Sequence, residues 1–195
     1  MSQQHLLFPI NLVCQWQSPA HFKGEDHLRH WLLEPSSLTA KLKRHCNDFR
    51  VVVLGQKIEP CDDLEANHVI KVGDKVLIRE VVLYCDDVPQ VFARSLIPLS
   101  TLTNEETQLA TLGTQPLGQV LFNDSSLERK HLELASFDLQ STVGQLVKTL
   151  PINTANAPLM WGRRSLFFIH QKPLMVAEVF LPGAFAYQQE TLIHE

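Results

Sequence analysis

Two pairs of short apolar runs, each pair joined by turn-forming residues, constrain the fold more than any other feature of the sequence. The first pair is 75–84 with 90–99, and the second is 165–170 with 173–181. Asp86, Asp87 and Pro89 lie between the runs of the first pair, and Gln171-Lys172 lies between those of the second. β-branched and aromatic runs bounded by such polar residues are typical of β-hairpins. The sequence therefore predicts two antiparallel hairpins.

Further strands and several short helices are predicted around these hairpins. Strands are expected at 49–54 and 127–137, and the second of them alternates as a half-exposed edge strand does. Helices are expected at 27–34 before Pro35, from Ser36 or Ser37 through LTAKLKRHC, from a capping box at 103–106 to Gly113, at 117–122, and near 143–150. Strands in hairpins with helices grouped apart indicate an α+β fold, with a single antiparallel β-sheet and flanking helices.

The length of the chain favours one domain that spans residues 1–195. A chain of 195 residues that is 45% hydrophobic can bury enough apolar surface to fold without a disulfide or a structural metal. Residues 1–26 are weakly patterned and are expected to form an irregular lead-in. Residues 138–158 are expected to be mostly a loop insertion.

Charge and cysteine usage exclude several classes of protein. The formal net charge of −4 argues against a nucleic-acid-binding protein, which usually carries a basic face. The cysteines Cys14, Cys46, Cys61 and Cys85 form no CxxC pair, so reduced thiols are expected. The first residues lack the pattern of a signal peptide, and no run approaches the ~20 apolar residues of a membrane span. We therefore expect a cytoplasmic protein.

Two charged residues occupy strand positions with apolar neighbours. Arg79 alternates with Leu77 and Val81, and Glu178 lies in a run whose two faces are both apolar. A buried, unpaired charge costs several kcal/mol, so each needs a partner or a function. In one interpretation, Arg79 and Glu178 pair with each other or with other charges in the sheet. In the other, they belong to a dry pocket where Arg79 binds a carboxylate and Glu178 moves a proton.

Other charged residues give weaker signals. Arg163 and Arg164 are adjacent, so in a strand only one of them can reach a pocket, and on a loop both would be solvated. Arg94 is either a second basic group of the pocket or an edge residue. His27 and His30 lie one helical turn apart, which suits metal ligands, but no third ligand follows at a meaningful distance. We therefore expect no metal site.

Five sequence blocks follow one another between about Trp31 and Phe185. They are WLLEPSSLT, LIREVVLYCDDVP, RSLIPLSTL, TLGTQPLGQVLF and WGRRSLFFIHQKPLMVAEVFLP. The ordered set, and LIRE, PLG, WGRRS and AEVFLP above all, resembles the chorismate–pyruvate lyase (chorismate lyase) family of ubiquinone biosynthesis.

The resemblance implies a fold and an activity. The fold would be an antiparallel sheet with a buried aromatic pocket covered by flaps. The protein would be a monomer that needs no metal or organic cofactor. It would eliminate pyruvate from chorismate to give 4-hydroxybenzoate, the first committed step of ubiquinone biosynthesis, and it would be inhibited by that product.

The resemblance also implies roles for four residues. Arg79 would hold the ring carboxylate, and Glu178 would lie at the other end of the ring, near the hydroxyl and the departing ether. Leu117 would line the pocket, and Leu38 would belong to a flap, at a position where the family can have Met. Glu178 would act as an acid/base or, if hydrogen moves within the substrate, only position it. Arg163, Arg164 or Arg94 would meet the side-chain carboxylate.

The sequence departs from the family pattern in two places, and other functions stay open. The connection at 138–158 is longer than expected, and Ala93 stands where a smaller Gly is expected. One alternative is a ligand-sensing domain of the same fold, as in some bacterial transcription regulators. We favour an enzyme because the first 30 residues are too short and too weakly basic for a helix-turn-helix module. A lyase acting on another aromatic or cyclohexadiene carboxylate is a further alternative.

Overall fold

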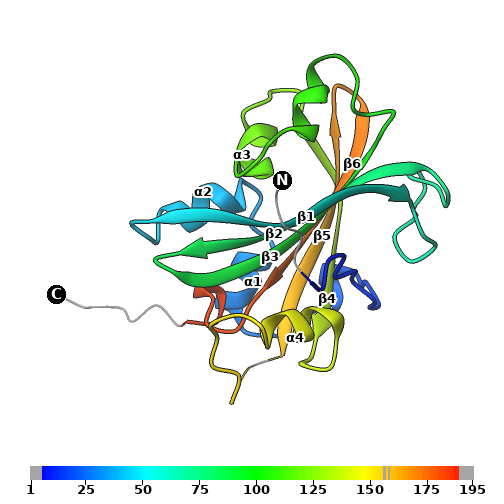
Figure 1. Ribbon diagram of the computed structural model, residues 1–195. Coiled ribbons are helices and arrows are strands. Elements are labelled where there is room, and N and C mark those ends of the chain that lie inside the picture. The colour runs from blue at the N-terminus through cyan, green and yellow to red at the C-terminus, as the bar shows by residue number, and fades with distance from the viewer. Residues whose placement is uncertain (1–5, 156, 158, 189–195) are drawn as a thin grey trace.

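Six strands pair into one antiparallel sheet in the order β1-β2-β3-β6-β5-β4 (Figure 1). The computed structural model describes residues 6–155, 157 and 159–188. The strands are β1 (Phe49–Pro60), β2 (Lys75–Cys85), β3 (Val88–Pro98), β4 (Glu128–Phe137), β5 (Met160–Ile169) and β6 (Lys172–Phe180). The predicted α+β fold with a single antiparallel sheet is therefore confirmed.

The two predicted hairpins are confirmed, and their turns are tighter than expected. Asp86 and Asp87 link β2 to β3, and His170 and Gln171 link β5 to β6. All four residues have positive φ, between 46° and 64°. Two-residue turns with this left-handed backbone match the twist of the strands that they join. The pairing of β3 with β6 then joins the two hairpins into one sheet.

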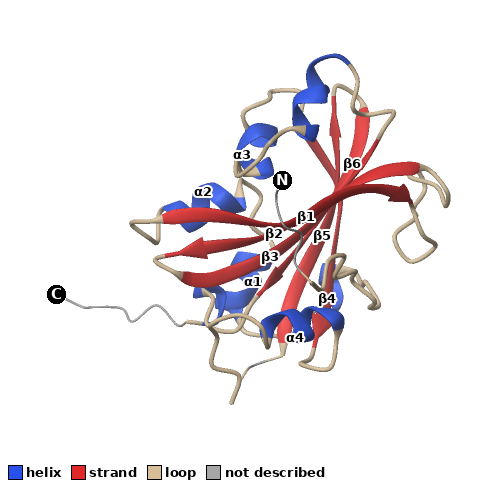
Figure 2. Cartoon of the chain, in the orientation of Figure 1, coloured by secondary structure: helices blue, strands red, loops and turns tan. Residues whose placement is uncertain are grey.

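Short helices cover both faces of the sheet (Figure 2). They are the α-helices α1 (Asp26–Leu32), α2 (Leu38–Lys43), α3 (Leu117–Phe122) and α4 (Thr142–Val147), and the 3₁₀ helices η1 (Pro19–His21), η2 (Asn104–Ala110) and η3 (Phe185–Tyr187). Among the described residues, no helix is long and apolar enough to cross a membrane.

Each strand presents a different set of side chains to the two faces. On β2, Leu77, Val81 and Leu83 pack with α1, α2 and α3, on what we call the α1–α3 face. Val82 packs with α4 on the opposite side, the α4 face. The predicted alternation is confirmed, because Arg79 shares the first face with Leu77 and Val81, and Glu80 shares the second with Val82.

Three local predictions need correction. The predicted capping box at 103–106 is wrong, because the Thr103 side chain makes no capping hydrogen bond and 104–110 forms a 3₁₀ helix. The Glu106 carboxylate, the other half of the box, bonds His170 and Lys172 instead. The helix capped by Ser37, whose hydroxyl accepts a bond from the Ala40 amide, ends at Lys43 rather than Cys46. The first strand continues to Pro60, since an edge strand accommodates polar residues and proline.

The lead-in and the expected insertion both pack against the sheet. Ile10 and Leu12 of the irregular lead-in are buried in the core of the α4 face, and Gln17 pairs with Leu134. Within 138–158 the structure has the helix α4, whose Val143, Leu146 and Val147 fill the same core. Residues 1–5 of the lead-in, and 156 and 158 of the insertion, lie outside the described residues.

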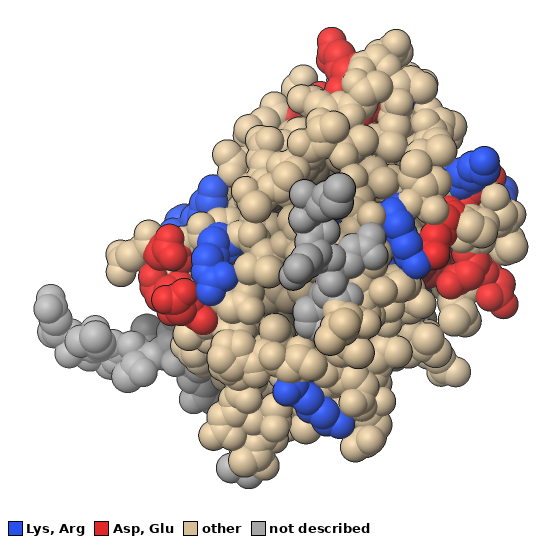
Figure 3. Space-filling view, in the orientation of Figure 1, with Lys and Arg blue, Asp and Glu red and all other residues tan. Residues whose placement is uncertain are grey.

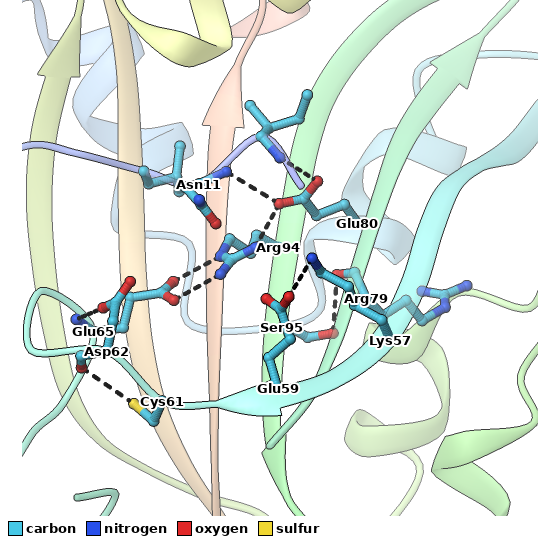
Figure 4. A network of polar contacts seen from close by, with 12 residues as sticks. Asn11, Lys57, Glu59, Cys61, Asp62, Glu65, Arg79, Glu80, Arg94 and Ser95 are labelled. Carbon is cyan, nitrogen blue, oxygen red and sulfur yellow. Dashed lines mark hydrogen bonds and ion pairs between the residues drawn. The ribbon is translucent and has the colours of Figure 1, made fainter. Parts of the chain in front are cut away.

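Buried charges on the α4 face tie separate segments together (Figure 4). The Arg94 guanidinium donates from Nε and Nη2 to the carboxylate of Glu65, at 2.7 Å each, and from Nη1 to Glu80, at 2.6 Å. The Glu80 carboxylate also accepts a 2.7 Å bond from the amide of Ile10. Burial raises the pKa of Glu80, although Arg94 and the amide lower it. This network fixes the 61–74 loop and the lead-in onto the central strands.

Replacing Arg94 by Met should lower the free energy of unfolding by about 3–5 kcal/mol, because Glu65 and Glu80 would remain buried without their cation. Replacing Arg50, whose exposed ion pair with Asp87 lies at the end of the sheet, should cost about 1 kcal/mol or less. Urea denaturation of both variants measures the difference. Equal losses would contradict a dominant role for the buried network.

Candidate active site

A narrow cavity lies between the α1–α3 face of the sheet and the helices α2 and α3. Its volume is about 40 Å³, which is room for a few water molecules. Its floor is the sheet and its roof is formed by the two helices; it is lined by Thr39, Arg79, Val81, Leu83, Ala93, Ser95, Pro116, Leu117, Gly118, Leu121, Phe122, Arg129, Arg163, Phe167, Val176 and Glu178. The lining is therefore mostly apolar, with a few charged groups.

Arg79 reaches the cavity from β2 and is almost fully buried. Its Nη2 donates to the carbonyls of Gly113 and Gln115, at 2.9 and 3.2 Å, which hold the guanidinium in place. Its Nε has no hydrogen-bond partner, and no carboxylate in the described part of the chain pairs with it. Burial lowers the pKa of Arg79 to about 10. Arg79 and Glu178 therefore do not pair with each other, whereas Glu178 does pair with another charge in the sheet, Arg163.

Glu178 pairs with Arg163 instead. The Arg163 Nε donates to Oε2 of Glu178 at 2.6 Å, and its Nη1 donates to the carbonyls of Leu32 and Glu34, at 3.3 and 2.9 Å. Oε1 of Glu178 receives no hydrogen bond from the residues described, and the side chain is 16% exposed, because it faces the cavity rather than a filled core. Arg163 is itself only 1% exposed. One carboxylate oxygen thus stays open to a ligand.

Arg129 is a cavity residue that the sequence did not reveal. Its Nη1 donates to the Glu34 carbonyl at 2.9 Å, while Nε and Nη2 are buried and have no partner among the described residues. Its guanidinium lies over the rings of Phe167 and Phe122, at 5.0 and 5.8 Å from their centroids. Burial above all, and then the charge of Arg163, lowers its pKa to about 10.

A register shift explains why the sequence pattern does not place Arg129 on the cavity side. Strict alternation from Glu133, which faces Arg164 on the other side of the sheet, would place Arg129 on that same side. The pairing slips between Arg129 and His131, so Arg129 turns to the α1–α3 face. In the sequence, Arg129 also lies between Glu128 and Lys130, so it looks like part of an exposed charged segment. No signal in the sequence marks this bulge.

The charged side chains that line the cavity give it a net positive charge. Arg79, Arg129 and Arg163 supply three positive charges and Glu178 supplies one negative charge, so the cavity carries a net charge of +2. Two of the guanidinium groups keep nitrogen atoms without partners. Buried cations of this kind are suited to bind an anion through charge-assisted hydrogen bonds. By contrast, the outer surface in Figure 3 carries Lys, Arg, Asp and Glu side chains of both signs near one another.

The apolar candidate residues lie on the α1–α3 face, but not all of them line the cavity. Leu117 and Ala93 line the cavity, and Ala93 pairs with Glu178 in the sheet. Leu38 packs in the core behind the cavity, and its neighbour Thr39 faces the cavity instead. Both residues are buried in α2, but they point in different directions, and Thr39 is the one that lines the cavity.

Two arginines that were candidates for the site lie on the α4 face. Arg94 is held by its two carboxylates, and Arg164 donates to Glu133 at 2.7 and 3.0 Å and lies over the ring of Trp16. Of the adjacent pair, Arg163 reaches the cavity and Arg164 lies on the opposite face of the sheet. The alternative of a solvated loop is wrong, because both residues lie within β5.

His27 and His30, the pair with metal-ligand spacing, have different surroundings. Nε2 of His27 lies 2.9 Å from the carbonyl oxygen of Phe185, and His30 is exposed. Within residues 6–155, 157 and 159–188, no three His, Cys, Asp or Glu side chains gather in a way that could hold a metal ion.

Comparison with known proteins identifies the family of the chain. A family model described as chorismate lyase matches residues 11–192. The "Probable chorismate pyruvate-lyase" of Psychromonas ingrahamii is 44% identical over 83% of this chain and 86% of that protein. The protein of the same name from Photobacterium profundum is 42% identical over 96% of both chains.

Solved structures share the fold at low identity. PhnF from Mycobacterium smegmatis superposes with a TM-score of 0.53 at 15% identity, over 76% of this chain and 65% of that one. A GntR-family transcriptional regulator from Bacillus cereus superposes with a TM-score of 0.50 at 13% identity, over 76% and 100%. These likenesses concern the fold alone. The family match and the relatives above 40% identity decide the assignment: the chain belongs to the chorismate lyase family.

Proposed function

We propose that this protein is a chorismate–pyruvate lyase, which eliminates pyruvate from chorismate and leaves 4-hydroxybenzoate. The observation that carries the proposal is the cavity itself, which is apolar, has a net charge of +2, and presents one carboxylate with an open oxygen. Chorismate is a cyclohexadiene with two carboxylates, so its ring suits the apolar walls and its charge suits the guanidinium groups. The cavity of about 40 Å³ is smaller than this ligand, so α2 and α3 would have to move outward to admit it. Family membership supports the same activity.

The positions of Arg79 and Glu178 suit the two ends of a six-membered ring. They lie on β2 and β6, which are separated by β3 alone, so their strands are about 10 Å apart. The unpartnered Nε of Arg79 can donate to the ring carboxylate. The open oxygen of Glu178 would then lie near the ring carbon that carries the hydroxyl group.

The reaction breaks one C–H bond and one C–O bond. The proton leaves the ring carbon that bears the hydroxyl, and the electron pair of that C–H bond forms the new ring double bond. The C–O bond to the enolpyruvyl group on the neighbouring carbon breaks at the same time, and its electrons leave with the enolate of pyruvate, which takes up a proton. The ring becomes aromatic, which supplies a large driving force. The protein therefore needs mainly to orient the substrate and assist one proton transfer.

In this proposal, Glu178 is the group that assists that transfer. The Arg163 guanidinium holds one carboxylate oxygen and so orients the other toward the cavity. In this proposal Glu178 accepts the proton from the ring carbon and returns it to the departing enolate. If hydrogen instead moves within the substrate, Glu178 only positions the hydroxyl group.

The finer parts of the proposal follow from the family resemblance. The protein would act as a cytoplasmic monomer without a cofactor, and its 4-hydroxybenzoate would enter ubiquinone biosynthesis. The fold shared with the GntR-family transcriptional regulator from Bacillus cereus favours a second candidate, a domain that binds a small aromatic carboxylate without reaction. Such a domain would need Arg79 but no group for proton transfer.

Purified protein mixed with chorismate should release pyruvate and 4-hydroxybenzoate in equal amounts, with or without a chelator. Pyruvate is followed through a coupled dehydrogenase, and 4-hydroxybenzoate is identified by chromatography. The lyase proposal fails if neither product forms. In that case, a rise in melting temperature with 4-hydroxybenzoate would support the sensor domain.

Replacing Glu178 by Gln should lower kcat by about 100- to 10,000-fold while leaving the affinity for 4-hydroxybenzoate unchanged, because Gln keeps the shape but cannot transfer the proton. Steady-state kinetics and calorimetry measure the two quantities. Glu133→Gln is the matched control, since Glu133 pairs with an arginine on the α4 face. A small loss of kcat in Glu178→Gln would leave Glu178 a positioning role only.

Added 4-hydroxybenzoate should slow the reaction from its first seconds. The cavity is narrow and covered by α2 and α3, so a planar product leaves only when these segments move. Initial rates of pyruvate release at increasing 4-hydroxybenzoate measure the inhibition. Progress curves that are insensitive to added product would refute slow release.

A further inference from the structure

We infer that Arg129 binds the second carboxylate of the substrate, the one on the enolpyruvyl side chain. This inference rests on the proposed function and names a residue that neither the sequence motifs nor the comparisons assign. The observation behind it is a buried guanidinium that faces the cavity with two nitrogen atoms, Nε and Nη2, lacking any partner among the described residues.

The other candidate arginines already have partners in the protein or a proposed role in binding. Arg94 and Arg164 pair with carboxylates on the α4 face. Arg163 gives its Nε to Glu178 and its Nη1 to backbone carbonyls. Arg79 is the cation placed for the ring carboxylate at the other end of the site. Arg129 is thus the cavity cation still without an anion, and a dianionic substrate has one carboxylate left.

The position of Arg129 agrees with that role. Its Nη1 and the Nη1 of Arg163 both donate to the Glu34 carbonyl, at 2.9 Å each, so the two guanidinium groups meet beside the Glu178 carboxylate. The strand order places Arg79 on β2 and Arg129 on the edge strand β4, with three strands between them. The two anion-binding groups therefore lie at opposite ends of the cavity, with Glu178 between them in the sheet.

In the free protein, the Arg129 guanidinium is buried without an anion to offset the cost of its lost hydration. Its guanidinium is held by one backbone carbonyl and the faces of two phenylalanine rings, which replace little of the lost hydration. The depressed pKa, about 10, reflects this burial. A carboxylate at Nε and Nη2 would make a bidentate pair, the geometry that a guanidinium favours.

The same contact would assist the reaction as well as binding. The enolate of pyruvate carries negative charge that the ether did not, and it forms on the side of the ring where Glu178, Arg163 and Arg129 meet. A cation fixed there before the C–O bond breaks stabilises that charge without rearrangement. Loss of Arg129 should therefore lower kcat as well as raise KM.

The experiment compares ligands with one and two carboxylates. Arg129→Met should lower kcat/KM for chorismate by roughly 10- to 100-fold, while the inhibition constant of 4-hydroxybenzoate, which has a single carboxylate, stays unchanged. Arg129→Lys keeps the charge without the planar fork and should fall between wild type and Arg129→Met. Arg164→Met removes an arginine from the α4 face and should alter neither quantity.

Three results would overturn the inference. Equal losses for chorismate and 4-hydroxybenzoate in Arg129→Met would give Arg129 a structural role only. No loss for chorismate would place the second carboxylate elsewhere. If Arg129→Met does not fold by its melting curve, Arg129→Lys decides, and wild-type affinity of that variant for chorismate counts against the inference. Wild-type protein that turns over no chorismate refutes the proposed function instead, so the two failures are distinguishable.

Discussion

The pairing of β3 with β6 is the contact on which the rest of the structure depends. It joins two local hairpins, far apart in the sequence, into one sheet. Without it, Arg79 and Glu178 would belong to separate hairpins, and no shared floor for the cavity would exist. The buried network of Arg94 with Glu65 and Glu80 lies on the other side of these central strands and fixes the segments that cover them.

The two faces of the sheet differ in how many of their buried arginines pair with a carboxylate. On the α4 face, Arg94 and Arg164 find carboxylates within the protein, and the charges serve the fold. On the α1–α3 face, Arg163 pairs with Glu178, but no carboxylate among the described residues pairs with Arg79 or Arg129. An unpartnered nitrogen alone does not make the difference, because Nη1 of Arg164 also lacks a hydrogen bond. Burying a cation without its anion costs stability, so such groups are typical of binding sites. This contrast, more than the shape of the cavity, distinguishes the site from the core.

Much of the fold could be predicted from the sequence because it depends on local patterns. Period-two alternation gave both hairpins, and it placed Arg79 and Glu178 on apolar strand faces. The capping box at Thr103 failed because Glu106 found stronger partners in Lys172 and His170, which are distant in the sequence. Leu38 was assigned by motif, and which of Leu38 and Thr39 faces the cavity depends on how α2 lies against the sheet.

The sequence by itself determined the family, the presence of the strands and the face of Arg79 on β2, since these follow from residue order along short segments. Only the tertiary structure decided the partners of the charges. Glu178 pairs with Arg163 across β5 and β6, Arg94 turns away from the cavity, and a bulge in β4 brings Arg129 into it. The physical reason is that an ion pair depends on distance in space and on strand register. A slip of one residue exchanges the two faces, and no local pattern records it.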